Sequence, residues 1–215
     1  SHEGPSGLVR VGATEGFGTL ILAPHLAQLT RKHPHLSIDL LALPRMLHLS
    51  RREADIVISL ERPTRGSVIV SRLSDYSLYL YGQREYLARK PLVATREDLR
   101  HHAFVSYVDD LLFTKELQFL DALHQPERFA FRSTSITAQY EAVRAGAGLA
   151  VLPAFLADRD PVLTRVLPQE GQFTRTFWMS MPSESKHLAR MQVTWAFLRE
   201  TVAAQQELLK PKAVR

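Results

Sequence analysis

The chain has 215 residues, of which 45% are hydrophobic and 23% charged, a composition typical of a folded globular protein rather than a disordered or fibrous one. It has no cysteine, which excludes a disulfide framework, a thiolate zinc site, an iron–sulfur cluster and a cysteine nucleophile, and favours the cytoplasm. The net charge of +5 is spread along the chain, which is weak support for nucleic-acid binding. No stretch reaches the ~20 continuous apolar residues of a membrane span.

The first 80 residues alternate strand and helix patterns. An apolar run with β-branched residues over 8–13 predicts a strand, a turn follows at 14–18, and periodic leucines predict a helix over 19–32. Further elements are expected as a strand at 36–43, a short helix at 44–53, a strand at 54–60, and strands at 68–73 and 76–81. Strand, helix and strand in succession form a βαβ unit, so we expect a parallel sheet.

From residue 81 the alternation begins again. The patterns predict helices at 84–89, 96–99, 113–123 and 136–145, strands at 104–107, 129–132, 149–152, 163–167 and 174–181, a helical turn at 153–158, and a closing helix at 188–209. Ser135 or Thr134 is suited to cap the 136–145 helix, and Gly146 to Gly148 to end it with positive φ. We expect two α/β lobes that share a cleft: residues 7–80 with 181–210, and residues 81–180.

Three segments resemble the effector-binding domain of LysR-type bacterial transcription regulators. They comprise residues 8–14, 22–26 and 32–34 around the first strand and helix, residues 52–58, and residues 143–153. The last segment, VRAGAGLAVLP, is similar to the family pattern VxAGxGIAxLP and is the most specific of the three. One departure is Arg52, which stands where the family prefers glycine.

The resemblance implies a type 2 periplasmic-binding-protein fold: α/β, two Rossmann-like lobes, and a small-molecule effector between them. It also implies a homodimer, a tetramer at full length, and DNA binding through a winged helix-turn-helix N-terminal to these residues. The side chains Leu20, Ile21, Leu22, Leu26 and Leu29 give the first helix more apolar width than one core needs, which favours the dimer. The alternative function is a solute-binding protein of a transport system, and an enzyme comes third.

Polar residues follow the carboxyl ends of predicted strands, where parallel α/β sheets bind ligands. The candidate effector-binding residues are Thr14, Glu15, Gly16 and Phe17 after the first strand, Arg62 and Tyr107 after two others, and Ser133, Thr134 and Ser135 in the second lobe. Their hydroxyls and amides suit a small organic acid or an aromatic metabolite, with Phe17 and Tyr107 as apolar walls. From the residues alone, Ser and Thr at these places are more often plain helix caps. The family resemblance favours the ligand interpretation.

Two residues of this set keep alternative interpretations. Glu15 disfavours an anion beside it, so it pairs with Arg62, points outward, or accepts from a donor group on the effector. Arg62 is equally well explained as an exposed loop cation. We find no catalytic motif, and the histidine pairs lack metal-ligand spacing, so we expect no catalytic residue, metal or cofactor.

Overall fold

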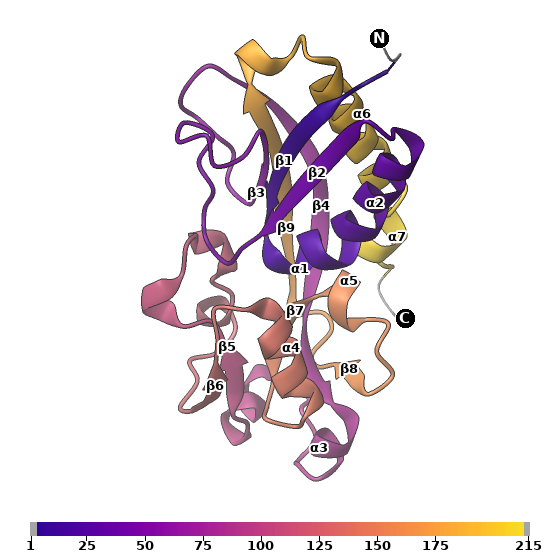
Figure 1. The fold of residues 1–215 in the computed structure, drawn as a ribbon. Helices are drawn as coiled ribbons and strands as arrows, with labels where there is room; N and C mark the ends of the chain where they lie inside the picture. The colour runs from indigo at the N-terminus through magenta and orange to yellow at the C-terminus, as the bar shows by residue number, and fades with distance from the viewer. Residues whose placement is uncertain (1–3, 213–215) are drawn as a thin grey trace. The chain divides into compact units, whose positions relative to one another are not determined.

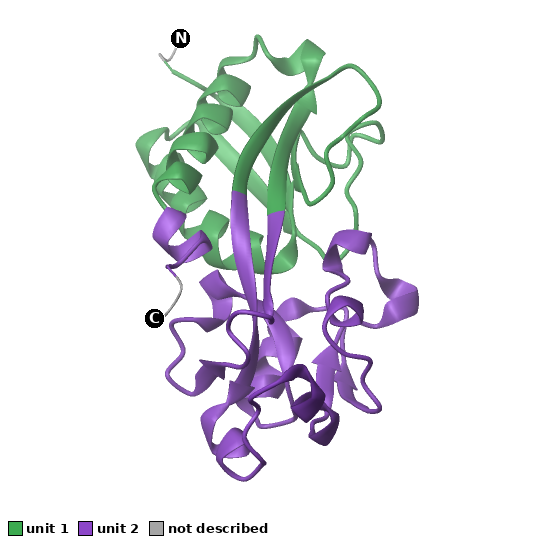
Figure 2. Cartoon of the chain, turned by 180° about the vertical axis from the view of Figure 1, so that it is seen from behind, with its two compact units in different colours: residues 1–74, 176–205 green, residues 75–175, 206–215 purple. Residues whose placement is uncertain are grey.

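The computed structural model describes residues 4–212, and the chain forms two compact units (Figures 1 and 2). Within these residues, unit 1 comprises the chain up to Ser74 together with Thr176–Gln205, and unit 2 comprises Asp75–Arg175 with the residues from Gln206 onward. The first boundary thus lies at Ser74, where the sequence predicted Leu80, and the last helical turn belongs to unit 2.

Unit 1 is built on most of a mixed seven-stranded sheet. The strand order is β2-β1-β3-β9-β4-β7, where β4 is Val68–Gln83 and β7 is Ala150–Pro153. Strand β1 (Gly7–Ala13) pairs in parallel with β2 (Leu36–Ala42) and β3 (Ile56–Ser59), and β9 (Gln172–Pro182) runs antiparallel to β3. The long helix α6 (Ala189–Ala203) contacts β1 and α2 (Ala23–Lys32). The predicted parallel βαβ unit is therefore present.

The helical segment after β1 begins at Glu15, four residues before the predicted helix start at Thr19. It comprises α1 (Glu15–Phe17), the π-helical turn η1 (Gly18–Leu22) and α2. Pro24 lies directly after the π turn, in the first turn of α2, where its nitrogen carries no hydrogen to donate to a carbonyl of the preceding turn.

The apolar side chains of this helix are used within the chain. Ile21, Leu22, Leu26 and Leu29 are at most 3% exposed, and only Leu20, at 37%, reaches the surface. The helix therefore lacks the surplus apolar width that was predicted to favour a dimer, because one core covers four of its five large side chains.

Residues 44–53 form a loop, so the helix predicted there is wrong. Leu47 turns inward and packs with Ala54 and Val57. It lies so close to Gly12 that a Cβ on that glycine would stand 2.2 Å from Leu47 Cδ1. Arg52 adopts a positive φ of 54°, a conformation that favours the glycine found at this position in the family. The apolar residues of the segment thus cover the sheet from a loop.

Unit 2 contains the β7 and β8 strands of the seven-stranded sheet, a separate two-stranded sheet and several short helices. Strand β4 (Val68–Gln83) pairs antiparallel with β7 (Ala150–Pro153) and β8 (Leu163–Arg165), and β5 (Phe104–Ser106) pairs in parallel with β6 (Phe129–Arg132). The helical elements are α3 (Arg84–Ala88), η2 (Arg96–His101), α4 (Ile136–Arg144), α5 (Ala154–Ala157) and α7 (Gln206–Leu209), while η6 (Ser183–Ser185) lies in unit 1.

Two predicted elements have different bounds in the structure. Strand β4 is continuous where two strands were predicted, because Ser74-Asp75 contains no glycine or proline and stays extended. The predicted closing helix is instead α6 followed by the separate turn α7, which contacts α5 and buries Leu209 completely.

The helix predicted at 113–123 is replaced by the 3-10 turns η3 (Asp109–Leu111), η4 (Lys115–Leu117) and η5 (Leu120–Ala122). Phe119 and Leu120 are both buried side chains of this segment. In addition, Arg175 donates to the carbonyls of Glu116 and Gln118, at 2.7 and 3.2 Å, and so takes acceptors that an α-helix would use.

The end of α4 agrees with the sequence. Gly146 has φ 84° and Gly148 has φ 155°, as predicted for the residues that end this helix. A Cβ on Gly148 would lie 2.3 Å from the carbonyl oxygen of Ala103, so only glycine fits beside that backbone.

Candidate functional site

Turn one, residues 14–17, follows β1 and comprises the N-cap Thr14 and the first helical turn of unit 1, α1. Thr14 is the N-cap, with extended backbone, and its carbonyl accepts from Gly18 at 2.9 Å. Its side chain makes no capping hydrogen bond. The amides of residues 15–17 come before Gly18, the first residue whose amide donates to a carbonyl of this helical segment, as at every helix start. Turn one therefore presents a hydroxyl that capping does not use, next to first-turn amides.

Phe17 lies in the core of unit 1. It is fully buried and stacks on Phe177, with ring centroids 4.1 Å apart. A side chain with no exposed surface is not a wall that a ligand contacts in this conformation, so we assign Phe17 to packing. Its backbone amide remains part of turn one.

Arg62 follows β3, and parallel β1 and β3 place turn one and Arg62 beyond the same edge of the sheet. The Arg62 side chain is exposed, and its guanidinium lies over the ring of Trp178, 5.3 Å from the centroid. The contact is a cation–π interaction at the surface, worth about 0.5–1 kcal/mol at exposed sites.

Turn two, residues 133–135, joins β6 to α4 in unit 2 and is held by hydrogen bonds. Ser133 donates its amide to Ser106 at 3.0 Å, and its Oγ accepts from the amide of Ser135. Ser135 caps α4, because its Oγ accepts from the amide of Ala138 at 3.0 Å. Thr134 is half-buried between them. Two of the three hydroxyls in this turn, those of Ser133 and Ser135, thus accept hydrogen bonds from backbone amides of the same region.

Gln139 is a residue of this region that sequence reasoning missed. Its side chain is 1% exposed, and its Nε2 donates to the carbonyl of Ser133 at 3.0 Å. The available signal was a glutamine on the helix face that also carries Ile136 and Val143, both buried. A polar residue in such a position needs a partner, and here the partner is the backbone of turn two.

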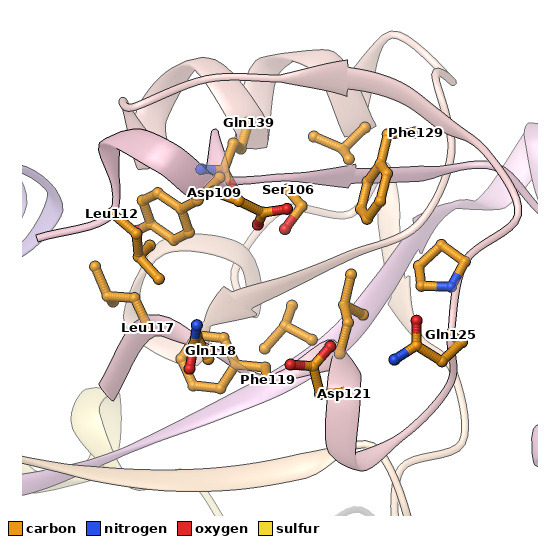
Figure 3. A pocket seen from close by; sticks show the side chains of 15 residues that line it. Ser106, Asp109, Leu112, Leu117, Gln118, Phe119, Asp121, Gln125, Phe129 and Gln139 are labelled. Atoms are coloured by element: carbon orange, nitrogen blue, oxygen red, sulfur yellow. The ribbon is translucent and has the colours of Figure 1, made fainter. Parts of the chain in front are cut away.

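Tyr107 follows β5 and lines a cavity of about 260 Å³ within unit 2 (Figure 3). The parallel pairing of β5 with β6, Ser106 opposite Arg132, brings Tyr107 and turn two to the same sheet edge. Gln139 also lines this cavity. The structure therefore groups Tyr107 with turn two, as it groups Arg62 with turn one.

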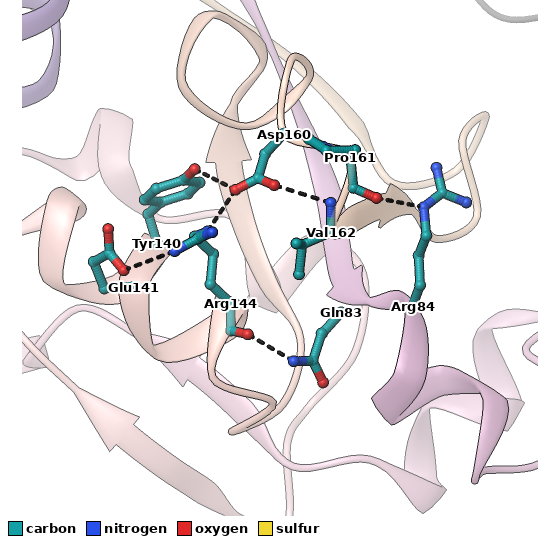
Figure 4. Close-up of polar contacts among 8 residues, drawn as sticks. All are labelled: Gln83, Arg84, Tyr140, Glu141, Arg144, Asp160, Pro161 and Val162. Atoms are coloured by element: carbon teal, nitrogen blue, oxygen red, sulfur yellow. Dashed lines mark hydrogen bonds and ion pairs between the residues drawn. The ribbon is translucent and has the colours of Figure 1, made fainter.

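The other end of α4 is fixed by an ionic network (Figure 4). Asp160 accepts from the hydroxyl of Tyr140, from Nε of Arg144 at 2.6 Å and from the amide of Val162 at 2.9 Å. Burial acts to raise the pKa of Asp160, but the bonds from Tyr140, Val162 and Arg144 outweigh it and hold the pKa below its ordinary value. Burial and the bond to Asp160 raise the pKa of Tyr140 to about 12.

Among residues 4–212 no three His, Asp or Glu side chains gather closely enough to hold a metal ion. In the same part of the chain no helix has the length and apolar character needed to cross a bilayer.

Residues 2–203 match the family profile described as the LysR substrate binding domain. The chain belongs to this family. The sequence-based assignment to LysR-type proteins and the α/β, periplasmic-binding-protein-like fold are thereby confirmed.

Solved structures agree with this family fold. The regulatory domain of CrgA, a LysR-type transcriptional regulator from Neisseria meningitidis, superimposes with a TM-score of 0.78 at 23% identity, over 91% of this chain and 98% of that one. The effector domain of the regulator AmpR from Pseudomonas aeruginosa gives 0.72 at 19% identity, over 93% and 97%. At these identities the LysR likeness establishes the fold alone.

Relatives by sequence are longer proteins named as transcription regulators. An uncharacterized HTH-type transcriptional regulator of Haemophilus influenzae is 24% identical over 77% of this chain and 59% of its own length. The Mau operon transcriptional activator of Paracoccus denitrificans is 29% identical over 73% of this chain and 51% of its own. The chain spans about half the length of these relatives.

Proposed function

We propose that this chain is the effector-sensing domain of a DNA-binding transcription regulator that responds to a small metabolite. The match of residues 2–203 to the LysR substrate binding domain carries the proposal. The relatives above are named as transcription regulators, which favours regulation over the alternative of a transport solute-binding protein and over an enzyme. With no membrane-crossing helix in the described residues, we place the regulator in the cytoplasm.

The ligand proposal assigns the effector to turn one and turn two. Thr14 offers a hydroxyl that makes no cap, beside the amides of Gly16 and Phe17. In turn two Ser133 and Thr134 offer hydroxyls, with Tyr107 beside them. Hydroxyls and first-turn amides suit a small organic acid or an aromatic metabolite carrying an anionic group.

Glu15 and Arg62 belong to the same proposal as the charged residues near turn one. Glu15 accepts from a donor group of the effector. Arg62, held over Trp178, adds positive potential at the surface. Ser135 acts by positioning turn two, because its hydroxyl caps α4.

The test is calorimetry with a panel of small carboxylates and aromatic metabolites. Thr14→Ala and Ser133→Ala each remove one hydroxyl and should weaken binding by about 0.5–1.5 kcal/mol, or up to about 3 if the ligand atom is charged. Thr14→Ser keeps the hydroxyl and should bind as the wild type does. A ligand that binds both alanine variants with unchanged affinity would show that the site lies elsewhere.

The assembly proposal is a homodimer, and a tetramer for the full-length protein. Large apolar side chains remain exposed in each unit, notably Leu8 at 46% in unit 1 and Phe131 at 40% in unit 2, and such residues are candidates for a subunit interface. Sedimentation at high micromolar concentration should show a dimer. Monomer alone at that concentration contradicts the proposal.

DNA recognition is proposed to reside in a helix-turn-helix outside these residues, as the names and lengths of the relatives suggest. The coding sequence upstream of Ser1 should encode it. Residues 1–215 alone should bind duplex weakly, through diffuse charge, with affinity that falls steeply with salt. Sequence-specific binding by this chain at physiological salt would contradict the assignment.

A further inference from the structure

The cavity of unit 2 has an apolar body and an acidic rim. Leu117, Phe119 and Leu120 are buried side chains of its wall. Asp109 and Asp121 also line it, and Figure 3 shows their carboxylates on opposite sides of the space. Within residues 4–212 no Lys, Arg or His side chain lines the cavity. We propose that this cavity binds a small organic cation, an apolar group that carries a primary ammonium.

The charge of the lining decides the ligand class. An ammonium group donates three hydrogen bonds, and the acceptors it needs are carboxylate and amide oxygens, which Asp109, Asp121 and Gln125 supply. A carboxylate ligand would instead meet two like charges. The cavity therefore selects the opposite charge from the one that suits turn one and turn two.

The two carboxylates are not equivalent. Asp109 is 78% exposed and its Oδ2 lies 3.9 Å from Nη1 of Arg132, which partly neutralises it through a weak, solvent-screened contact. Asp121 is also exposed and lies on the other side of the cavity, in η5, whereas Arg132 lies beside Asp109. We therefore expect Asp121 to contribute more to binding than Asp109.

The volume of the cavity limits the size of the ligand's apolar group. A volume of about 260 Å³ is below the ~300–1,000 Å³ of sites for drug-sized ligands. One aromatic ring with a two-carbon chain and an amine is a suitable probe. 2-Phenylethylamine meets this description, and 3-phenylpropanoate and 2-phenylethanol are its anionic and neutral counterparts.

Gln139 provides a local signal for occupancy. Its buried amide lines the cavity and at the same time donates to the carbonyl of Ser133. A ligand in the cavity should shift the side-chain amide resonance of Gln139 in NMR spectra. The signal distinguishes the cavity from a site confined to turn one.

The experiment measures binding of the three probes to residues 1–215 by calorimetry. The amine should bind at least about tenfold more tightly than the anion, the size of one charge-assisted hydrogen bond. Asp121→Asn should weaken amine binding about fivefold to tenfold and Asp109→Asn by less. The matched control is Asp110→Asn, an exposed neighbour that does not line the cavity, and it should bind the amine as the wild type does.

The cation proposal is overturned by no amine binding at millimolar concentration, by equal affinity for amine and anion, or by equal effects of Asp121→Asn and Asp110→Asn. The cavity shares Tyr107 with the proposed effector site but does not include Thr14, so the Thr14→Ala variant separates the two sites. Amine binding that falls with Thr14→Ala and leaves Gln139 unshifted would place the amine at turn one and also contradict the cavity assignment. Loss of carboxylate binding in Thr14→Ala, with amine binding intact, would support both sites.

Discussion

Turn one and turn two occupy equivalent places, each between a strand and the helix that follows it, yet they are stabilised differently. Turn one is anchored by packing, since Phe17 stacks on Phe177 and Thr14 makes no side-chain cap. Turn two is anchored by hydrogen bonds, in which Ser133, Ser135 and Gln139 bind backbone groups. A hydroxyl residue at the N-cap therefore has a different role in each unit. Ser135 caps α4 in unit 2, whereas the Thr14 hydroxyl in unit 1 makes no capping bond.

The two turns differ in whether the same residue contributes to both folding stability and ligand binding. In turn one the stabilising side chain, Phe17, and the candidate ligand group, Thr14, are different residues. In turn two the Ser133 hydroxyl belongs both to the local hydrogen bonds and to the proposed ligand contacts. Substitutions should consequently change stability and ligand affinity separately in turn one and together in turn two.

The largest expected effect comes from Phe17→Ala. Removing a fully buried aromatic side chain leaves a cavity in the core, and we expect a loss of about 3–5 kcal/mol in the free energy of unfolding. Urea denaturation measures this loss. Phe177→Ala should be similarly costly, and the double variant should cost less than the sum because the two rings contact each other. A loss below 1 kcal/mol for Phe17→Ala would refute the packing anchor of turn one.

The second effect tests the polar anchor of turn two. Gln139→Leu keeps the side-chain volume but leaves the Ser133 carbonyl without this donor, so we expect a loss of about 1–3 kcal/mol in the free energy of unfolding. Gln192→Leu is the matched control, since exposed Gln192 makes the same kind of bond, to the carbonyl of Lys186 at 2.9 Å. Equal losses in both variants would contradict the special role of Gln139.

The sequence alone predicted correctly the elements that depend on the residues of one short segment. Strand β1, the βαβ order of unit 1 and the Gly146 and Gly148 end of α4 follow from apolar patterns and from glycine's access to positive φ. Residues 113–123 were mispredicted because Arg175, distant in the sequence, binds the carbonyls that a helix would need.

The candidate site was predictable only in part. Strand ends locate turn one, turn two, Arg62 and Tyr107, because parallel strands place their carboxyl ends at one edge. The local pattern indicated Ser135 or Thr134 as the cap of α4, and Ser135 is the cap, but it did not show that the Thr14 side chain makes no capping bond. Local patterns also could not reveal the buried position of Phe17 or the partner of Gln139, since both depend on contacts between residues far apart in the chain.

The third prediction concerns the cap of α4. Ser135→Ala removes the oxygen that accepts from the Ala138 amide and should cost about 1 kcal/mol in the free energy of unfolding. Ser135→Asn retains a capping oxygen and should restore most of that stability. Thermal or urea unfolding distinguishes them. If the alanine and asparagine variants were equally stable, the cap would not be what holds this turn.

The fourth effect is confined to acid conditions and concerns the far end of α4. Asp160 has a pKa below its ordinary value in the folded chain, so its stabilisation is present above the unfolded pKa of about 3.9 and is lost as the pH falls through the folded value. Asp160→Asn does not titrate. The stability difference between wild type and variant should therefore shrink from pH 6 to pH 3 in urea unfolding, whereas Asp110→Asn should follow the wild type. A difference that stays constant with pH would exclude this linkage.

The smallest effect on stability is expected for Thr14→Ala, and it is the sharpest test of the contrast between the two turns. Because the Thr14 side chain makes no capping bond and is only half-buried, the free energy of unfolding should change by no more than about 0.5 kcal/mol. Ser135→Ala, at the equivalent N-cap of α4, should lose about twice that or more. Urea unfolding of the two variants side by side gives the comparison. If Thr14→Ala is as destabilising as Ser135→Ala, the hydroxyl is part of the fold after all, and its assignment to a ligand loses its support.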